Sequence, residues 1–152
     1  MENSNPSRRA VMRGALAAAA AGALAAPVSQ AASGSTSAGS YRVAFQVSDN
    51  DAKKWLLTLG NAHNAQQDLG AANITIEIVV YGPGIDMLLA GSEAAGRVQE
   101  ALQANIAVLA CQNTMRARGL KPQDLIPGVG FASSGVGELI KRQAEGYAYI
   151  RS

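Results

Sequence analysis

A single cysteine, Cys111, is the residue in this sequence whose type and position favour chemistry. It follows a short apolar run, residues 106–110, and three polar residues come directly after it: Gln112, Asn113 and Thr114. The apolar run predicts a buried strand, and the residues after it predict the start of a helix. Backbone N–H groups point outward at such a junction and stabilise negative charge. We therefore expect a thiol whose pKa lies below the free-cysteine value of about 8.5.

The same cysteine has a second interpretation, as a buried and inert side chain. Cysteine is among the residue types most often found in protein cores. One cysteine allows no intramolecular disulfide, no Cys-x-x-Cys pair and no cysteine zinc cluster. Asn113 and Thr114 are also explained as ordinary residues of a helix N-terminus. Position alone leaves both interpretations of Cys111 open.

The elements that must position Cys111 alternate between strands and helices. Apolar and β-branched runs predict strands over residues 41–47, 74–81, 106–110, 129–132 and 147–150. Helices are predicted over residues 52–69, from 91–92 to 103, and over 115–118, with a short helical turn at 85–89. Ser133 and Ser134 cap a last helix, whose inward face we expect to be Val136, Leu139 and Ile140. Strands separated by helices predict a three-layer α/β/α fold with a five-stranded, mostly parallel sheet.

Polar residues and glycines follow the predicted strands where each strand ends. In parallel sheets, ligands gather beyond the carboxyl ends of the strands. This convergence favours a functional Cys111 over a buried one. We expect Cys111 to be the catalytic residue, and the binding residues to be Asn50, Gly82, Gln112, Asn113, Thr114, Ser133 and Ser134.

Other candidate residues carry less weight. His63 is the sole histidine and has no other metal ligands at a suitable spacing, so we expect a partly buried packing residue and no metal site. The glycines of residues 128–137 include no Gly-Lys-Ser/Thr and fail the dinucleotide fingerprint, so turns explain them better. We expect no cofactor.

The first 40 residues predict an exported protein with one folded domain. Arg8 and Arg9 form a twin-arginine pattern, and residues 14–26 are small and apolar. The Ser29-Gln30-Ala31 segment places small residues at the positions that a signal peptidase reads. We expect a signal peptide over residues 1–31, cleaved near Ala31, a flexible linker over 32–40 and a periplasmic domain over 41–152. The apolar run is too short to span a bilayer, so no membrane contact is expected after cleavage.

Charge and composition narrow the partners. Three of the 13 basic residues and one of the 11 acidic residues lie in the leader, so the remainder is neutral and nucleic acid is a poor candidate. Neutral charge and 48% hydrophobic residues favour an apolar self-complementary surface, so we expect a homo-oligomer.

From residue 41 to 151 the sequence resembles the DsrE/DsrF-like family of sulfur-handling proteins. The resemblance rests on four segments in order: VVYGPGI at 79–85, VLACQNTMRARGL at 108–120, DLIPGV at 124–129 and EGYAYI at 145–150. It implies a three-layer α/β/α domain with a five-stranded sheet, assembled into dimers, trimers or hexamers. It also implies that sulfur-relay members carry a persulfide on a cysteine after the third strand, which corresponds to Cys111.

These observations lead to two hypotheses of different classes. The first is an exported sulfur carrier or sulfurtransferase, in which Cys111 takes sulfur from a sulfane-sulfur donor and passes it to an acceptor, each a small molecule or a protein thiol. The alternative is a non-catalytic periplasmic module, ligand-binding or structural, with an inert Cys111. A third outcome is oxidation or dimerisation of an exposed thiol.

Overall fold

The computed structural model describes residues 41–152. The predicted leader and linker, residues 1–40, lie outside the described residues. The elements follow in the order β1 (Tyr41–Val47), α1 (Ala52–Leu69), β2 (Ile74–Val80), the 3₁₀ helix η1 (Gly82–Leu88), α2 (Ala95–Gln103), β3 (Ala107–Cys111), α3 (Gln112–Arg118), the 3₁₀ helix η2 (Pro122–Asp124), β4 (Gly130–Ala132), α4 (Gly135–Ala144) and β5 (Ala148–Arg151).

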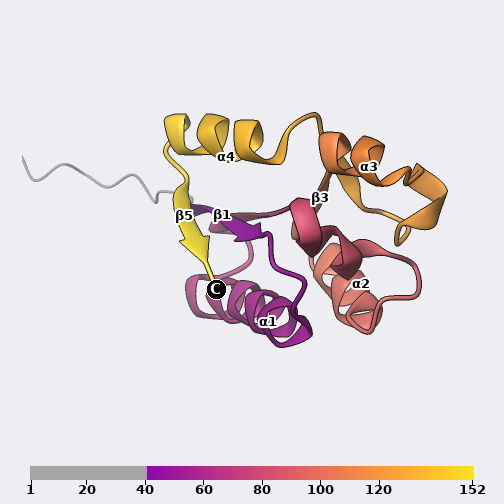
Figure 1. Cartoon of the computed structure of the whole chain (residues 1–152). Helices are drawn as coiled ribbons and strands as arrows, with labels where there is room; N and C mark the ends of the chain where they lie inside the picture. The colour runs from indigo at the N-terminus through magenta and orange to yellow at the C-terminus, as the bar shows by residue number, and fades with distance from the viewer. Residues whose placement is uncertain (1–40) are drawn as a thin grey trace, which may run out of the picture. The chain divides into compact units, whose positions relative to one another are not determined.

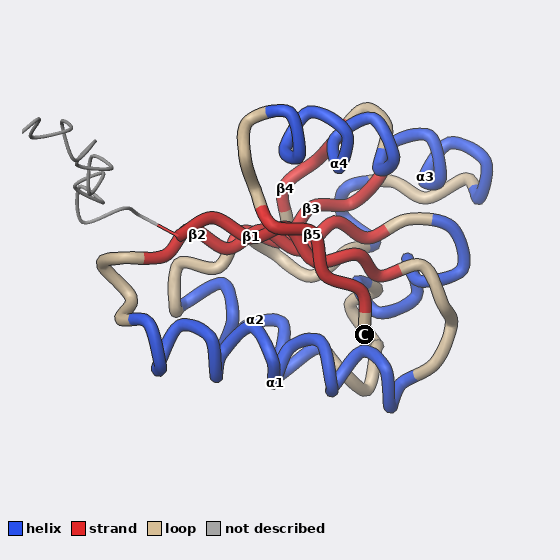
Figure 2. The backbone as a smooth tube through the Cα atoms, turned by 90° about the vertical axis from the view of Figure 1, so that its left-hand side faces the viewer, coloured by secondary structure: helices blue, strands red, loops and turns tan. Residues whose placement is uncertain are grey.

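The five strands form one sheet in the order β4-β3-β2-β1-β5, and every pair is parallel. Helices α1 and α2 lie on one side of the sheet, while α4, with α3 beside it, lies on the other (Figures 1 and 2). The predicted three-layer α/β/α fold is confirmed. Among residues 41–152, no helix is both long and apolar enough to cross a membrane.

The larger core lies between the sheet and helices α1 and α2. Alternate residues of β1, β2 and β3 face it, because successive side chains of a strand point to opposite sides. On β2 these are Ile74, Ile76, Ile78 and Val80, all buried. From α1 they meet a group that includes Trp55, whose indole N–H donates to the Asp49 carbonyl at 2.7 Å. This face fixes the register of the central strands.

The opposite face has a much smaller core, which is covered by α4. Three buried residues form it, Ala44, Val79 and Leu139, and the rings of Tyr81 and Tyr147 pack against them. The prediction of three inward residues on α4 is therefore right only for Leu139. Val136 and Ile140 are 51% and 61% exposed.

The rotation of α4 about its axis explains that error. Gly135 at the start of the helix is buried against the ring of Tyr81, and Arg142 two turns later reaches Glu77. These contacts turn the face that contains Leu139 toward the sheet and leave Ile140, a further 100° around the helix, outside. Sequence periodicity does not determine which side of a mixed apolar stripe faces inward.

Element boundaries moved by a few residues, as helix and strand ends commonly do. The third strand includes Cys111, which pairs with Ala132 of β4. Helix α3 begins at Gln112 rather than at residue 115. Helix α2 begins at Ala95, because Ser92 first forms a turn in which its hydroxyl accepts the Ala94 N–H at 3.2 Å.

Candidate functional site

Cys111 is the last residue of β3 and the N-cap of α3. Its backbone is extended, so the chain turns from strand to helix directly after it. Val108 and Ala110 belong to the larger core. Strand alternation therefore directs the Cys111 side chain to the other face of the sheet, where α4 begins. The residue is 4% exposed in the single chain.

The sulfur of Cys111 lies near the N-termini of two helices, α3 and α4. The N–H of Gly135, the first residue of α4, donates to Sγ at 3.2 Å. On α3, Cys111 makes no side-chain capping hydrogen bond, but the Thr114 hydroxyl and the N–H groups of Thr114 and Asn113 lie close enough to favour the thiolate. Burial of the thiol raises its pKa, but these polar groups and the Gly135 N–H outweigh that effect, so the pKa of Cys111 lies below its ordinary value.

Thr114 is held in place by Gly82, a predicted site residue that begins η1 after strand β2. The N–H of Gly82 donates to Thr114 Oγ1 at 2.9 Å. Because that oxygen is already an acceptor, the hydroxyl hydrogen is free to point at the Cys111 sulfur. Gly82 and Thr114, both predicted as binding residues, thus meet at Cys111, where they support the thiol rather than face solvent.

Gly135 and Tyr81 are site residues that the sequence prediction missed. A Cβ at Gly135 would lie 2.7–2.9 Å from three atoms of the Tyr81 side chain, closer than real Cβ contacts. Only glycine therefore lets the α4 N-terminus approach the sulfur this closely. The available signal was Ser134, whose hydroxyl accepts the Gly137 N–H at 3.2 Å and caps α4 as predicted.

The remaining predicted residues fall into two groups. Gln112, Asn113 and Ser133 are exposed around Cys111, on the first turn of α3 and on the loop before α4. Arg116 donates to the Asn113 side chain. Gln112 also lines a shallow cavity of about 220 Å³, whose other lining residues are Met115, Arg116, Leu120, Pro122 and Phe131.

Asn50 takes part in a different contact. Its Nδ2 donates to the carboxylate of Asp86 in η1 at 2.9 Å. The same carboxylate is 2.6 Å from the guanidinium of Arg118, at the end of α3. Asn50 therefore links the β1–α1 loop to η1 and to the end of α3. It contacts Asp86 and not the groups around the Cys111 sulfur.

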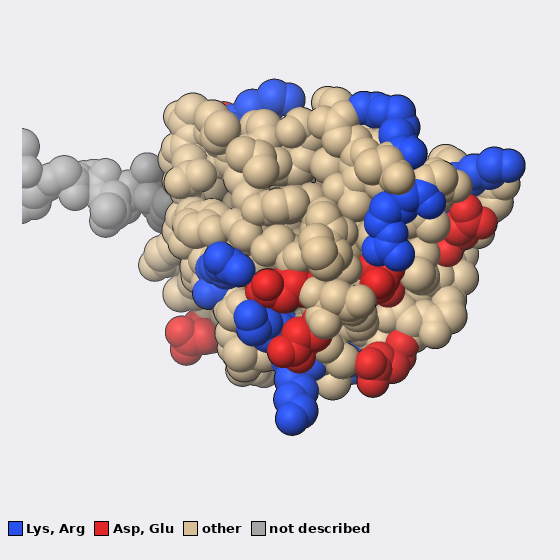
Figure 3. Space-filling model, viewed as in Figure 1, with Lys and Arg blue, Asp and Glu red and all other residues tan. Residues whose placement is uncertain are grey.

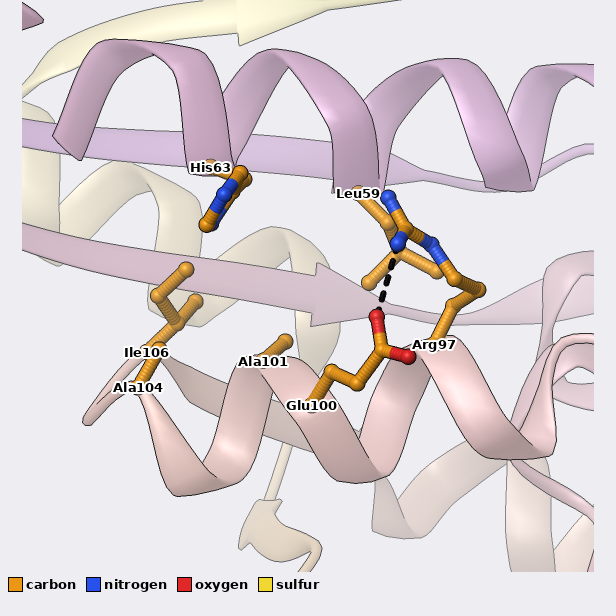
Figure 4. Close-up of a pocket in the computed structure, with 7 residues that line it drawn as sticks. All are labelled: Leu59, His63, Arg97, Glu100, Ala101, Ala104 and Ile106. Carbon is orange, nitrogen blue, oxygen red and sulfur yellow. Dashed lines mark hydrogen bonds and ion pairs between the residues drawn. The ribbon is translucent and has the colours of Figure 1, made fainter. Parts of the chain in front are cut away.

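A cavity of about 280 Å³ lies between α1 and α2, on the opposite side of the sheet from Cys111 (Figure 4). His63 borders it from α1 and is exposed, with Nε2 3.0 Å from the Gln67 amide nitrogen. The predicted packing role of His63 is thus only partly met. The Arg97–Glu100 pair, at 2.7 Å, lies on the α2 side. Across residues 41–152, no three His, Cys, Asp or Glu side chains are grouped to hold a metal ion.

Fold and site together define a three-layer α/β/α protein that presents one cysteine at the carboxyl end of a parallel sheet, with helix N–H groups directed at its sulfur. The chain belongs to the DsrE/DsrF-like family, whose model matches residues 41–151. This confirms the resemblance seen in the sequence. Among curated proteins, none matches the chain.

Solved structures share the fold. A protein of unknown function from Methanobacterium thermoautotrophicum is 41% identical, with a TM-score of 0.70 over 74% of this chain and 99% of its own. The ychN protein from E. coli is 13% identical, with a TM-score of 0.61 over 75% of this chain and 99% of its own. A conserved protein of unknown function from Bacteroides thetaiotaomicron is 15% identical, with a TM-score of 0.61 over 73% and 94%. The last two show likeness of fold alone.

Proposed function

We propose that this chain is an exported sulfur carrier or sulfurtransferase that holds transferred sulfur as a persulfide on Cys111. Membership of the DsrE/DsrF-like family suggests sulfur relay. The observation that carries the proposal is the hydrogen bond from the Gly135 N–H to the Cys111 sulfur, at a site where the polar groups of Thr114 and Asn113 also lower the pKa of the thiol. Such donors stabilise a thiolate, which is the nucleophilic form of cysteine.

The lowered pKa of Cys111 raises its thiolate fraction, so the proposed attack involves no separate base. With thiosulfate as donor, the Cys111 thiolate attacks the outer sulfur, the S–S bond of thiosulfate breaks, and sulfite leaves with its electron pair. The product is a persulfide anion on Cys111. An acceptor thiolate then attacks the terminal sulfur, which regenerates the Cys111 thiolate and leaves a persulfide on the acceptor. The N–H groups of Asn113, Thr114 and Gly135 stabilise the anion in each state.

One observation favours the alternative, a non-catalytic module with an inert thiol. Cys111 is only 4% exposed, so little of the residue is accessible to a donor. The exposed predicted residues around it are Gln112, Asn113 and Ser133. Access to the sulfur is therefore the property that separates the two functions.

Two measurements on native protein decide between them. Protein incubated with thiosulfate or polysulfide is analysed by mass spectrometry, and we expect one added sulfur atom, about 32 Da, on the peptide that contains Cys111. Cys111→Ser is the control and gains none. Alkylation with iodoacetamide is measured in parallel across pH. A thiol that stays unmodified until the protein is unfolded, with no sulfur taken up from either donor, would establish the inert module.

Export and assembly form the rest of the proposal. The twin-arginine pattern of Arg8 and Arg9 supports export to the periplasm. Cell fractionation of a bacterial expression host tests it, with Arg8→Lys/Arg9→Lys as the matched variant. We expect the mature chain in the periplasm and the double variant retained in the cytoplasm. Wild-type protein that remains cytoplasmic with an intact leader would contradict export.

An apolar surface supports homo-oligomer formation. Val136 and Ile140 of α4 and Tyr149 and Ile150 of β5 are all at least 41% exposed. Figure 3 shows a broad region without charged side chains across the upper left of the molecule, where α4 and β5 lie in the same view of Figure 1. Burial of such a surface between identical chains removes apolar area from water.

A further inference from the structure

A buried ion pair joins α4 to the middle of the sheet. Glu77 on β2 is 5% exposed. Nε of Arg142 on α4 donates to both carboxylate oxygens of Glu77 at 3.1 Å, and Nη2 lies 3.0 Å from Oε2. A guanidinium that contacts a carboxylate at several points fixes both distance and orientation. The pair therefore holds the C-terminal half of α4 at one place on β2.

The surroundings of Arg142 strengthen this attachment. Its guanidinium also contacts Glu138 at 3.0 Å and Glu145 at 2.9 Å, and it lies 5.4 Å from the centre of the Tyr147 ring. Hydrogen bonds to Glu77 first, and then to Glu145, raise the pKa of Arg142 above its ordinary value. Arg142 thus keeps its positive charge.

Few other contacts hold α4 on this face. The core beneath it contains only three buried residues, of which Leu139 alone comes from the helix. The larger core, on the other side of the sheet, includes no residue of α4. Ion pairing at Glu77 is therefore a large part of what sets the position of α4.

The two ends of α4 contact β2 and the residue directly after it, at similar spacings on helix and strand. Glu77 and Tyr81 are four residues apart, about 13 Å along a strand, and their side chains point to the same face. Gly135 and Arg142 are seven residues apart, about 10.5 Å along a helix, and lie on one helix face. Gly135 packs on Tyr81 while Arg142 binds Glu77, so a displacement at one end of the helix moves the other.

We propose that Glu77 and Arg142 are positioning residues for Cys111, because their ion pair holds α4 where the Gly135 N–H meets the cysteine sulfur. This inference rests on the proposed function, since it explains how the reactive thiolate is maintained. Neither residue touches the sulfur. Glu77 pairs with Ala107 in the sheet, four residues before Cys111 on β3, so its charge is about 13 Å away along the strand.

The test is the pH profile of Cys111 alkylation by iodoacetamide in the native full chain. Glu77→Gln, Arg142→Lys and the control Lys141→Gln are compared with wild type. Lys141 is the neighbouring residue on α4, has the same charge as Arg142, and has a side chain 64% exposed. Circular dichroism and thermal unfolding check that each variant folds.

The direction in which the alkylation rate changes separates a positioning role of Glu77 from a direct effect of its charge. Removal of the Glu77 charge would by itself favour the thiolate and speed alkylation at pH 7. Displacement of the Gly135 N–H has the opposite effect. We expect alkylation at pH 7 about three- to tenfold slower in Glu77→Gln, and a smaller decrease in Arg142→Lys, which keeps the charge but loses the guanidinium geometry. Lys141→Gln should match wild type.

A wild-type profile in both folded variants, or faster alkylation in Glu77→Gln, would overturn the inference. Should Glu77→Gln not fold, the Arg142→Lys profile alone decides. Persulfide formation is measured on the same samples so that the two proposals fail separately. Wild type that takes up no sulfur, with a slower Glu77→Gln, removes sulfur transfer and keeps the positioning role. If wild type forms the persulfide and both variants keep the wild-type pH profile, the positioning role is removed and sulfur transfer is kept.

Discussion

The N–H of Gly135 donates to the sulfur of Cys111 at 3.2 Å and connects two residues 24 positions apart in the chain. One residue ends a strand and starts a helix, and the other starts the helix of the next βαβ unit. The sulfur thus accepts from α4 while it sits at the start of α3, and the polar groups of Thr114, Gly135 and Asn113 lower the pKa of the thiol.

Replacement of Thr114 should make Cys111 a poorer nucleophile. Thr114→Val removes the hydroxyl that lowers the pKa of the thiol but keeps the side-chain shape. A hydrogen bond to a charged group contributes about 1.5 kcal/mol, so we expect alkylation at pH 7 about tenfold slower. Thr114→Ser keeps the hydroxyl and should stay near wild type. Equal rates in Thr114→Val and wild type would remove Thr114 from the site.

Gly135 should not tolerate a side chain, although it begins an exposed helix. Gly135→Ala places a Cβ against the ring of Tyr81, and we expect it to lower the free energy of unfolding by about 1–3 kcal/mol and to slow Cys111 alkylation. Gly60, within α1, has open space around its Cβ position and is the matched control. Gly60→Ala should stabilise by about 0.5–1 kcal/mol with no change in alkylation. Chemical denaturation measures both.

Stability should depend on pH through Cys111. A folded-state pKa below the unfolded value means that the native state favours the thiolate, so this contribution is complete above the unfolded pKa. It is lost as the pH falls through the lowered folded-state pKa. The free energy of unfolding of wild type relative to Cys111→Ser should therefore rise with pH between these two values and level off above them. A difference that stays constant across pH would show that the thiol is not perturbed.

Asn50 should affect stability but not the thiol. Asn50→Ala removes one hydrogen bond to Asp86, which keeps its ion pair with Arg118. We expect a loss of about 0.5–1.5 kcal/mol in the free energy of unfolding. The pH profile of Cys111 alkylation should not change. A large change in that profile would return Asn50 to the site, where the sequence prediction placed it.

The proposed assembly should depend on the exposed flank of α4. Ile140→Glu introduces a charge at a position that is 61% exposed, so it should cost less than about 0.5 kcal/mol in a monomer but disrupt an apolar interface. Leu57→Glu, at a position 53% exposed on α1, is the control. Light scattering should show a smaller particle for Ile140→Glu only. A monomeric wild type at high concentration would end this proposal.

Periodicity and residue type were sufficient for the architecture. The run that ends in Val47 and the helix that ends before Gly70 were predicted at their observed boundaries, because β-branched runs and capping residues act over a few neighbours. The five strands and the alternation with helices followed in the same way. Twin-arginine export, the linker and the oligomeric state stay predictions, since residues 1–40 and any second chain lie outside what the structure describes.

The site was predictable only in part. Cys111 at a strand-to-helix junction could be identified from its neighbours in sequence, and so could the Ser134 cap. Asn50 and Gly82 were grouped with it because both follow strands, yet Gly82 supports Thr114 while Asn50 binds Asp86. Strand ends share an edge of the sheet, but the edge is wider than one site. Sequence order cannot measure that width.

The sequence by itself determined which residues form strands and helices and that one cysteine would end a buried strand, because these properties depend on neighbours a few positions apart. Only the tertiary structure decided what surrounds the sulfur. The Gly135 N–H, the Tyr81 ring that requires a glycine there, and the ion pair of Glu77 with Arg142 all join residues distant in the chain. Their meeting depends on the rotation and height of α4 on the sheet, which packing fixes and local pattern does not.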